Sequence, residues 1–171
     1  ELRPLSCDGS DFDLTAGNML TLIDSLDMLV LMGNHTEFAR AVRLVAKRAN
    51  FDLDETVSVF ETTIRILGGL VSAHVFASDP ELGAMPDYDD DLLPLIVDIA
   101  DRLLPAFSTN TSIPFGTVHL QDGVPPNETT EACTAAAGSL SMEFGVVSIL
   151  TGDPKYGLAA RAALKSIFDH R

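Results

Sequence analysis

One apolar stretch, Val57 to His74, most constrains what this chain can fold into. At the helical period its residues are apolar on nearly every side, which is typical of a helix surrounded by other helices. Two adjacent glycines, Gly68 and Gly69, interrupt the stretch, and each costs about 1 kcal/mol relative to Ala in a helix interior. This cost predicts that a neighbouring helix approaches closely at the two glycines.

The same stretch contains one acid and one base, Glu61 and Arg65, at positions i and i+4. At this spacing the two side chains share one face of the helix. Burying either charge alone is costly, so the pair must be ion-paired, hydrogen-bonded or open to a polar cavity. Two interpretations remain open: a structural ion pair, which the spacing alone favours, and a polar site inside the fold.

A helix that is apolar almost all round is followed by an amphipathic helix three times along the chain. The predicted pairs are 15–32 with 36–48, 57–77 with 92–104, and 135–150 with 155–168. The second member of each pair has one apolar stripe and charged residues facing water. This repeat predicts an all-α fold of helical hairpins, with the apolar helices in an inner ring and the amphipathic helices in an outer ring.

The segments outside these pairs are predicted to be irregular. Residues 1–14 are interpreted as an arm, and residues 105–131 as a long insertion in which 113–120 has room for a short strand or hairpin. Three sequons in predicted turns or loops, at Asn34, Asn110 and Asn127, are candidate N-glycosylation sites. Together the sequons favour residence in the secretory pathway over the cytosol.

The charge balance argues against two classes of partner. The chain has 11 basic and 25 acidic residues, with a net charge of −14, which disfavours nucleic acids and anionic membranes. A transmembrane segment is not expected, because Asp24 and Asp27 interrupt the apolar 19–32 stretch before it reaches about 18 residues. The sequence begins at Glu1 without a signal-like segment, so any targeting peptide is expected to lie outside this chain.

No metal-binding pattern is found in the sequence. The two cysteines, Cys7 and Cys133, do not form a CxxC motif, and the histidines lack zinc-site spacing. The acidic run 87–91 lacks the glycine and the terminal glutamate of a calcium-binding EF-hand loop. We therefore interpret it as a solvated cap for the following helix and predict no metal site within this chain.

Four carboxylates belong to the predicted inner helices: Asp24, Asp27, Glu61 and Glu143. Asp24 and Asp27, at positions i and i+3, are predicted to share one face of the first inner helix. In a ring of hairpins these helices line the central cavity, where paired carboxylates are the equipment for glycoside hydrolysis. An acid that works near neutral pH needs its proton held by desolvation or by nearby negative charge, and Arg65 has the opposite effect on Glu61. Helix capping and hydrogen bonding between hairpins remain the alternative, which we expect for at least one of Asp24 and Asp27.

Successive blocks of the sequence resemble the class I α-mannosidases of glycoside hydrolase family 47. The blocks occur in the order of the family and span nearly the whole chain: Leu20–Asp27, Val59–His74, Leu103–Phe107 and Met142–Asp153. Within the family, Pro4–Cys7 and Cys133–Ala135 resemble the ER degradation-enhancing (EDEM) branch, nearest its second paralogue.

The resemblance implies an (α/α)7 barrel, a toroid of helical hairpins, with a calcium ion in its active site. The implied activity is the inverting removal of terminal α1,2-linked mannose from high-mannose N-glycans. In the EDEM branch this trimming occurs in the lumen of the endoplasmic reticulum and, as part of the unfolded protein response, directs misfolded glycoproteins to degradation. An oxidoreductase of that compartment is an implied partner.

Site residues are implied position by position. Glu61 resembles the glutamate assigned as general acid, although the division of roles among the carboxylates is debated in the family. Arg65 resembles a substrate-contacting arginine, and Glu143 a glutamate of the sugar site. Cys7 resembles a cysteine that bonds to a later part of the domain, so a bond between Cys7 and Cys133 is not expected.

The resemblance covers about three of the seven hairpins of such a barrel. Residues 1–171 are therefore expected to be the incomplete, N-terminal part of one catalytic domain, which is inactive alone. The base and the ligands of the calcium ion are expected to lie outside this chain. Three alternatives remain: a non-hydrolytic mannose-binding lectin or adaptor in the same pathway, a glycan-processing class I mannosidase, and an unrelated α-toroid that serves as an interaction scaffold.

Overall fold

The computed structural model describes residues 2–9, 15 and 19–170 of the chain, and its fold is all-α apart from two short strand pairs. The helices are α1 Leu20–Ile23, α2 Leu26–Leu31, α3 His35–Arg48, α4 Val59–Glu61, α5 Gly68–Ser78, α6 Leu93–Leu103, α7 Thr134–Gly138, α8 Ser141–Thr151 and α9 Lys155–Asp169. The antiparallel strand pairs are β1 Leu2–Arg3 with β2 Asp8–Gly9, and β3 Thr56–Ser58 with β4 Thr117–His119. The predicted fold class is confirmed.

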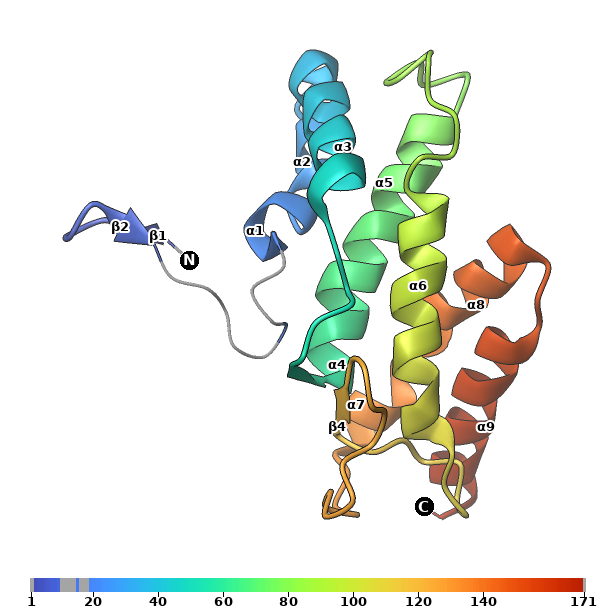
Figure 1. Ribbon diagram of the computed structural model, residues 1–171. Helices are drawn as coiled ribbons and strands as arrows, with labels where there is room; N and C mark the ends of the chain where they lie inside the picture. The colour runs from blue at the N-terminus through green and yellow to red at the C-terminus, as the bar shows by residue number, and fades with distance from the viewer. Residues whose placement is uncertain (1, 10–14, 16–18, 171) are drawn as a thin grey trace.

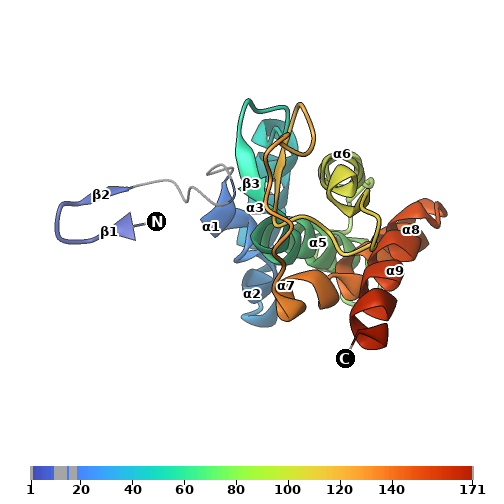
Figure 2. The ribbon, with the colours of Figure 1, turned by 90° about the horizontal axis from the view of Figure 1, so that it is seen from below.

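Helical hairpins stand side by side in a row (Figures 1 and 2). Within the row α2 packs on α3, α5 on α6, and α8 on α9. The middle member α5 also contacts both α2 and α8, so the first helices of the three hairpins are neighbours. This arrangement agrees with the predicted alternation of inner and outer helices.

The middle inner helix runs from Val59 to Ser78 through α4, a π-helical turn at Thr62–Leu67, and α5. Such wide turns are rare inside α-helices and frequently mark functional sites. The helix begins later than predicted, because Val57 and Ser58 belong to β3 and pair with the long insertion. A strand was expected within 113–120, and β4 confirms it.

Two predicted inner helices are broken. The first divides into α1 and α2 at Asp24–Ser25, where the Ser25 hydroxyl donates to the carbonyl oxygen of Leu22 at 3.2 Å and offers the backbone an alternative to helix. Residues 16–18 of this prediction lie outside the described residues. The third divides into α7 and α8 at Ser139–Leu140, where Gly138 and Ser139 are weak helix formers.

Two predictions for irregular segments were wrong. In the predicted arm, residues 2–9 form the β1–β2 pair, while residues 10–14 lie outside the described part of the chain. The acidic run does not cap α6, whose first turn contains no acidic residue. Asp87 accepts a hydrogen bond from Arg43 Nη2 at 2.6 Å instead, because the run turns back toward α3.

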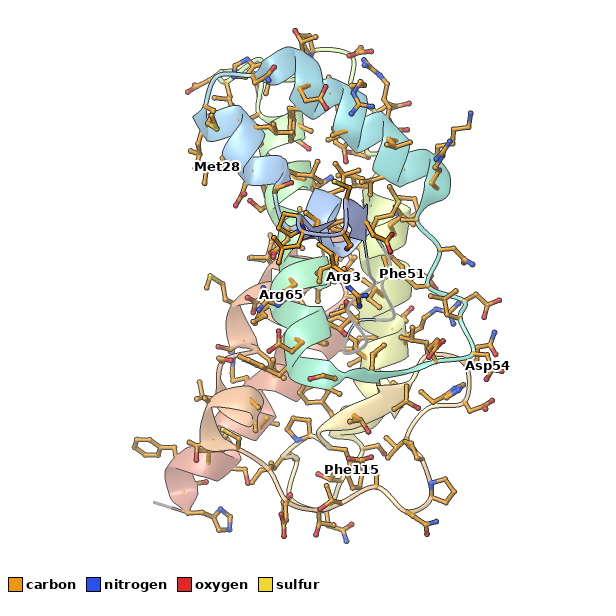
Figure 3. All side chains as sticks on the ribbon, turned by 90° about the vertical axis from the view of Figure 1, so that its left-hand side faces the viewer. Arg3, Met28, Phe51, Asp54, Arg65 and Phe115 are labelled. Atoms are coloured by element: carbon orange, nitrogen blue, oxygen red, sulfur yellow. The ribbon has the colours of Figure 1, made fainter. Side chains whose placement is uncertain are left out.

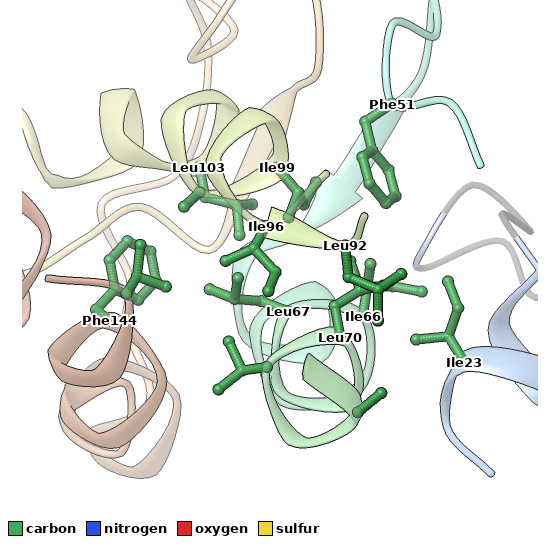
Figure 4. Packing of buried hydrophobic residues seen from close by; sticks show 14 of the residues in the cluster. Ile23, Phe51, Ile66, Leu67, Leu70, Leu92, Ile96, Ile99, Leu103 and Phe144 are labelled. Carbon is green, nitrogen blue, oxygen red and sulfur yellow. The ribbon is translucent and has the colours of Figure 1, made fainter. Parts of the chain in front are cut away.

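The hydrophobic core surrounds the middle hairpin (Figure 4). Ile66, Leu67 and Leu70 of the middle helix are at most 1% exposed. Around them lie Ile23 of α1, Phe144 of α8, and a row of fully buried residues that begins just before α6, namely Leu92, Ile96, Ile99 and Leu103. Each such side chain contributes roughly 1.5–3 kcal/mol through its burial. The core therefore fixes the middle helix from several sides at once.

Both ends of the row expose large apolar side chains. Met28 and Leu31 of α2 are 53% and 71% exposed, and Met142 and Ile149 of α8 are 71% and 80% exposed. Clusters of this kind usually mark surfaces that pack against something else. They have the character expected of a segment of a closed ring, in which further helices cover both ends.

Two helical stretches, Val59–Ser78 and Thr134–Thr151, are long and apolar enough to cross a membrane by length and composition. Half of the tested window in the first stretch is buried within the fold, and the packed core helix of a globular protein meets the same criteria. Length and composition are the only support for a membrane span here.

The predicted close approach at the glycine pair is confirmed. A Cβ atom at Gly69 would lie 2.9 Å from the carbonyl oxygen of Ile23, a backbone atom that cannot turn away. We expect Gly69→Ala to lower the free energy of unfolding of a protein that contains this domain by about 1–3 kcal/mol, as overpacking does. Chemical denaturation measures the change. Gly145→Ala in α8 is the matched control, because a Cβ there meets nothing within 4 Å; an equal loss in both variants would contradict the packing argument.

Stability is expected to fall in mild acid because of His74, a buried residue of α5. Desolvation lowers the pKa of His74 below its ordinary value of 6.5. The negative charge of Asp90 raises this pKa, but its effect is smaller. Its Nδ1 lies 2.8 Å from the Tyr88 hydroxyl, and burial raises the pKa of that hydroxyl to about 12, so the phenol stays protonated beside the imidazole.

The pKa of His74 is lower in the folded chain than in the unfolded chain. The unfolded chain therefore binds more protons than the folded chain when the pH falls below the ordinary pKa of 6.5. The contribution of His74 is present above that value and is lost as pH falls through it toward the folded pKa. We expect the Tm of a protein that contains this domain to decrease as the pH is lowered from about 7.5 to about 5. The Tm of its His74→Gln variant should decrease less over this range. Parallel pH profiles of the two proteins would exclude His74 as the cause.

Candidate active site

The guanidinium group of Arg65, near the start of the middle helix, joins two carboxylates that come from different helical segments. Arg65 Nε donates to Glu61 Oε2 at 2.6 Å, and Arg65 Nη1 donates to Asp24 Oδ2 at 3.2 Å. The hydrogen bond with Glu61 is the main cause that raises the pKa of Arg65 above its usual range, and Asp24 adds to it. The predicted pairing of Glu61 with Arg65 is confirmed, and Asp24 joins the same cluster. Figure 3 shows the place of Arg65 on the middle helix.

The cluster is partly open to solvent. The Glu61 side chain is 22% exposed, that of Arg65 38% and that of Asp24 43%. Ion pairs with this exposure are screened by water and contribute little to stability. The three charged groups are therefore held in one arrangement and are also accessible from solvent. A purely structural pair in the core would not need this access.

The position of Glu61 is fixed by the start of the helix and by the small sheet beneath it. Ser58 caps the helix by accepting a hydrogen bond from the Glu61 backbone amide at 3.3 Å. The backbone amide of Val59, the residue after Ser58, donates to the carbonyl oxygen of Gly116 at 3.0 Å and ties the start of the helix to the long insertion. Glu61 thus lies in the first helical turn, next to the point where the insertion joins the helix.

A cavity of about 300 Å³, which we call the Glu61 cavity, adjoins this turn. Its other walls come from the turn Pro114–Gly116 and from residues 131–133, 136 and 137. Volumes of this order are at the small end for small-molecule sites. Phe115 and Cys133 line the cavity, and no local pattern predicted either, because it is the β3–β4 pairing that brings the insertion to Glu61.

Cys133 and Cys7 are both free, exposed thiols in this structure. Hydrogen bonds from the backbone amides of Ala136 and Ala135 lower the pKa of the Cys133 thiol. A bond from Cys7 to a later part of the domain stays a prediction.

Glu143 lies in the first turn of α8 and packs against the middle helix. A Cβ atom at Gly68 would lie 3.6 Å from its Cγ atom, an ordinary van der Waals distance, so the Glu143 side chain packs beside the middle helix at this glycine. Its Oε2 atom is buried and has no hydrogen-bond partner among the described residues. Leaving such an oxygen unpaired is costly, which makes it a candidate acceptor for a ligand hydroxyl.

Asp27 does not join the cluster. The break at Asp24–Ser25 places Asp24 at the end of α1 and Asp27 in the first turn of α2, so the predicted shared helical face is wrong. Within the described part of the chain the Asp27 side chain makes no hydrogen bond or ion pair. Its place near the start of α2 favours the helix-end alternative. That Asp27 is one of the inner-cavity carboxylates stays a prediction.

Metal ligands are not gathered in the described ranges 2–9, 15 and 19–170: no group of three or more His, Cys, Asp or Glu side chains is placed to hold an ion. These residues therefore do not fit a calcium site by themselves, and we assign no step to the ion. Ligation of calcium by residues outside this chain stays a prediction.

The three sequon asparagines, Asn34, Asn110 and Asn127, are all exposed. Asn34 also caps α3, because its side-chain oxygen accepts a hydrogen bond from the Glu37 amide at 3.3 Å. Exposure is a requirement for glycosylation, and the modification itself stays a prediction.

Comparisons with known proteins bear on this site. The family model of glycosyl hydrolase family 47 matches residues 1–171. Alpha-mannosidase I MNS4 of Arabidopsis thaliana is 49% identical over 172 residues, covering 100% of this chain and 27% of that protein. The human ER degradation-enhancing alpha-mannosidase-like protein 2 is 46% identical over 174 residues, covering 100% of this chain and 30% of the relative.

A solved structure shares the fold. The alpha-1,2-mannosidase from Trichoderma reesei matches with a TM-score of 0.74 and 28% identity, over 90% of this chain and 34% of that one. The chain thus spans between about a quarter and a third of the length of these proteins.

Proposed function

The chain belongs to glycosyl hydrolase family 47, and on that premise we propose that it is part of an inverting, calcium-dependent α1,2-mannosidase. Its proposed substrates are high-mannose N-glycans of misfolded glycoproteins, trimmed for degradation in the lumen of the endoplasmic reticulum. The names of the relatives as alpha-mannosidases and as ER degradation-enhancing proteins support this proposal. The exposed sequons are compatible with that compartment.

The observation that carries the proposal is the Glu61–Arg65–Asp24 cluster beside the Glu61 cavity. In the proposed reaction Glu61 gives a proton to the glycosidic oxygen as the bond to mannose breaks. Arg65 holds the Glu61 side chain in one orientation through its Nε donor and contacts the sugar. Glu143 accepts a hydrogen bond from a sugar hydroxyl through its buried Oε2 atom. Inversion also needs a second carboxylate that activates water, which we place outside this chain.

Mannose release by the full-length protein tests the proposal. A free high-mannose N-glycan is the substrate, and NMR identifies the anomer of mannose that appears first. We expect the β-anomer, because a single displacement inverts the α-linkage, and we expect chelation of calcium to stop the release. Binding of the glycan without any release would favour the lectin alternative, and an initial α-anomer would exclude inversion.

We also propose that residues 1–171 are the N-terminal part of a single catalytic domain and do not hydrolyse glycans alone. The apolar ends of the hairpin row support this, because they would pack against further helices of the same domain. Mannose release by the isolated chain at the rate of the full-length protein would contradict it. The proposed partner oxidoreductase would have access to two exposed thiols, Cys7 and Cys133.

A further inference from the structure

The middle helix contains a wide turn, the π-helical segment Thr62–Leu67. At its end the backbone amide of Gly68 donates to the carbonyl oxygen of Thr63, five residues earlier instead of the four of an α-helix. Such a turn holds one residue more than an α-helical turn, so it rotates the residues after it relative to those before it. Glu61 directly precedes the wide turn, and Arg65 lies within it. The geometry of this turn therefore sets how Arg65 faces Glu61.

Packing fixes the helix on both sides of the wide turn. Before it, the Val59 amide donates to the carbonyl oxygen of Gly116 at 3.0 Å. After it, the helix lies directly against the first hairpin, because a Cβ atom at Gly69 would be 2.9 Å from the carbonyl oxygen of Ile23. Leu70, one residue further along, is fully buried. The additional residue is therefore confined to the part of the helix that carries the guanidinium group of the site.

The side chain of Thr63 holds the start of the wide turn. It is fully buried, and its hydroxyl donates to the carbonyl oxygen of Val59 at 2.7 Å. The same carbonyl oxygen also accepts a hydrogen bond from the backbone amide of Thr62. A threonine hydroxyl that bonds to the carbonyl four residues earlier often bends a helix locally. The Thr63 hydroxyl thus joins the wide turn to the residue through which the insertion anchors the helix.

Thr63 lies close to the charged cluster but outside the cavity. It does not line the Glu61 cavity, and its hydroxyl points along the helix to Val59. Arg65, two residues further along, reaches Glu61 at 2.6 Å and Asp24 at 3.2 Å. These two carboxylates come from different helical segments, so one planar guanidinium meets both only while the backbone at Arg65 keeps its place.

We propose that Thr63 is a positioning residue for the mannosidase reaction: its hydroxyl holds the wide turn in the shape in which Arg65 contacts Glu61 and Asp24 together. The inference rests on the proposed function, and it adds a buried residue that touches neither the substrate nor the reacting atoms. Thr63 acts on the orientation of Glu61 through Arg65, so its effect falls on kcat more than on KM.

Thr63→Val in the full-length protein removes the hydroxyl and keeps the shape of the side chain. We expect kcat for mannose release from a free high-mannose oligosaccharide to fall by about tenfold, because even a small misplacement of a catalytic group is costly. KM should change little, since the walls of the Glu61 cavity are unaltered. Thr63→Ser keeps the hydroxyl and should keep kcat near the wild-type value, although the loss of a buried methyl group lowers its stability.

Thr62→Val is the matched control. Thr62 belongs to the same turn and is also buried, but its hydroxyl has no hydrogen-bond partner among the described residues. The same substitution removes no bond there, so we expect an unchanged kcat. Equal losses in Thr62→Val and Thr63→Val would show a general effect of valine in the turn and would overturn the proposal. A wild-type kcat in Thr63→Val, or an equal loss in Thr63→Ser, would overturn it as well.

A double-mutant cycle tests whether Thr63 acts through Arg65. In the Arg65→Ala background, adding Thr63→Val should lower kcat/KM by less than about twofold, because the guanidinium that Thr63 positions is already gone. Residues with independent roles would instead show additive losses. The same loss from Thr63→Val in both backgrounds would therefore contradict the proposal.

The outcome is separable from that of the proposed function. Crystal structures of the full-length wild type, Thr63→Val and Thr63→Ser show the contacts of Arg65 whether or not the protein is active. We expect Thr63→Val to lose at least the longer contact, that of Arg65 with Asp24, and Thr63→Ser to keep both. If the wild type releases no mannose, the proposed function fails and these structures still decide the role of Thr63. Both contacts preserved in Thr63→Val would refute that role.

Discussion

Replacing Glu61 by Gln in the full-length protein is expected to lower kcat for mannose release by roughly a thousandfold, within the range lost when a general acid is removed. Glutamine has nearly the same shape and still accepts a hydrogen bond from Arg65 through its amide oxygen. Its amide nitrogen, however, does not supply the proton that the leaving oxygen needs. KM should therefore change little, because the glycan still meets the same walls. The rate of mannose release from a high-mannose oligosaccharide measures the effect.

Asp27→Asn is the matched control for this experiment. Asp27 is another acidic residue of a predicted inner helix, and it makes no bond to the Arg65 cluster in the part of the chain that the structure describes. We expect its kcat to stay close to that of the wild type, because the Asp27 side chain is not bonded to the groups that hold Glu61 in the described part of the chain. Trimming that persists at the wild-type rate in Glu61→Gln would rule out Glu61 as the acid.

Arg65→Ala is expected to reduce kcat/KM by about a hundredfold, the loss that a misplaced catalytic group commonly causes. The variant removes the 2.6 Å bond that orients Glu61 and leaves Asp24 without its ion-pair partner. Arg65→Lys should recover only part of the activity. Lysine keeps the charge, but it lacks the planar fork that reaches two carboxylates at once.

The same variant decides between the two interpretations of the Glu61–Arg65 pair. Because Arg65 is 38% exposed, its ion pairs should contribute only about 0–1 kcal/mol to stability. A role in the site therefore predicts a large loss of activity with a small change in Tm. A structural ion pair predicts instead that kcat per folded molecule is unchanged, with only the stability affected. Measuring both quantities on one preparation of Arg65→Ala separates the two.

Much of the fold follows from short-range pattern. Apolar residues around the whole circumference of 57–74 predicted a packed helix, and Gly68–Gly69 predicted a close neighbour, which is Ile23 at Gly69. The i,i+4 spacing of Glu61 and Arg65 predicted their contact, since a helical turn sets that distance regardless of what surrounds it. Such features depend only on residues within one or two turns of each other.

The assembly of the site depends on contacts between distant segments. The i,i+3 spacing wrongly placed Asp24 and Asp27 on one helical face, because the break at Ser25 turns the chain and leaves only Asp24 within reach of Arg65. The pairing of Thr56–Ser58 with Thr117–His119 brings Phe115 and Cys133 to Glu61. No local periodicity indicates which strand a three-residue segment will choose.

The sequence by itself determined the alternation of inner and outer helices, the ion pair of Glu61 with Arg65 and the need for a small residue at the helix crossing. Only the tertiary structure decided which carboxylates meet, how the insertion closes around Glu61, and that Glu143 packs on Gly68 with one buried oxygen unpaired. The reason is physical: helical periodicity repeats every few residues and is visible locally. The convergence of side chains from remote segments is selected by the packing of the whole chain.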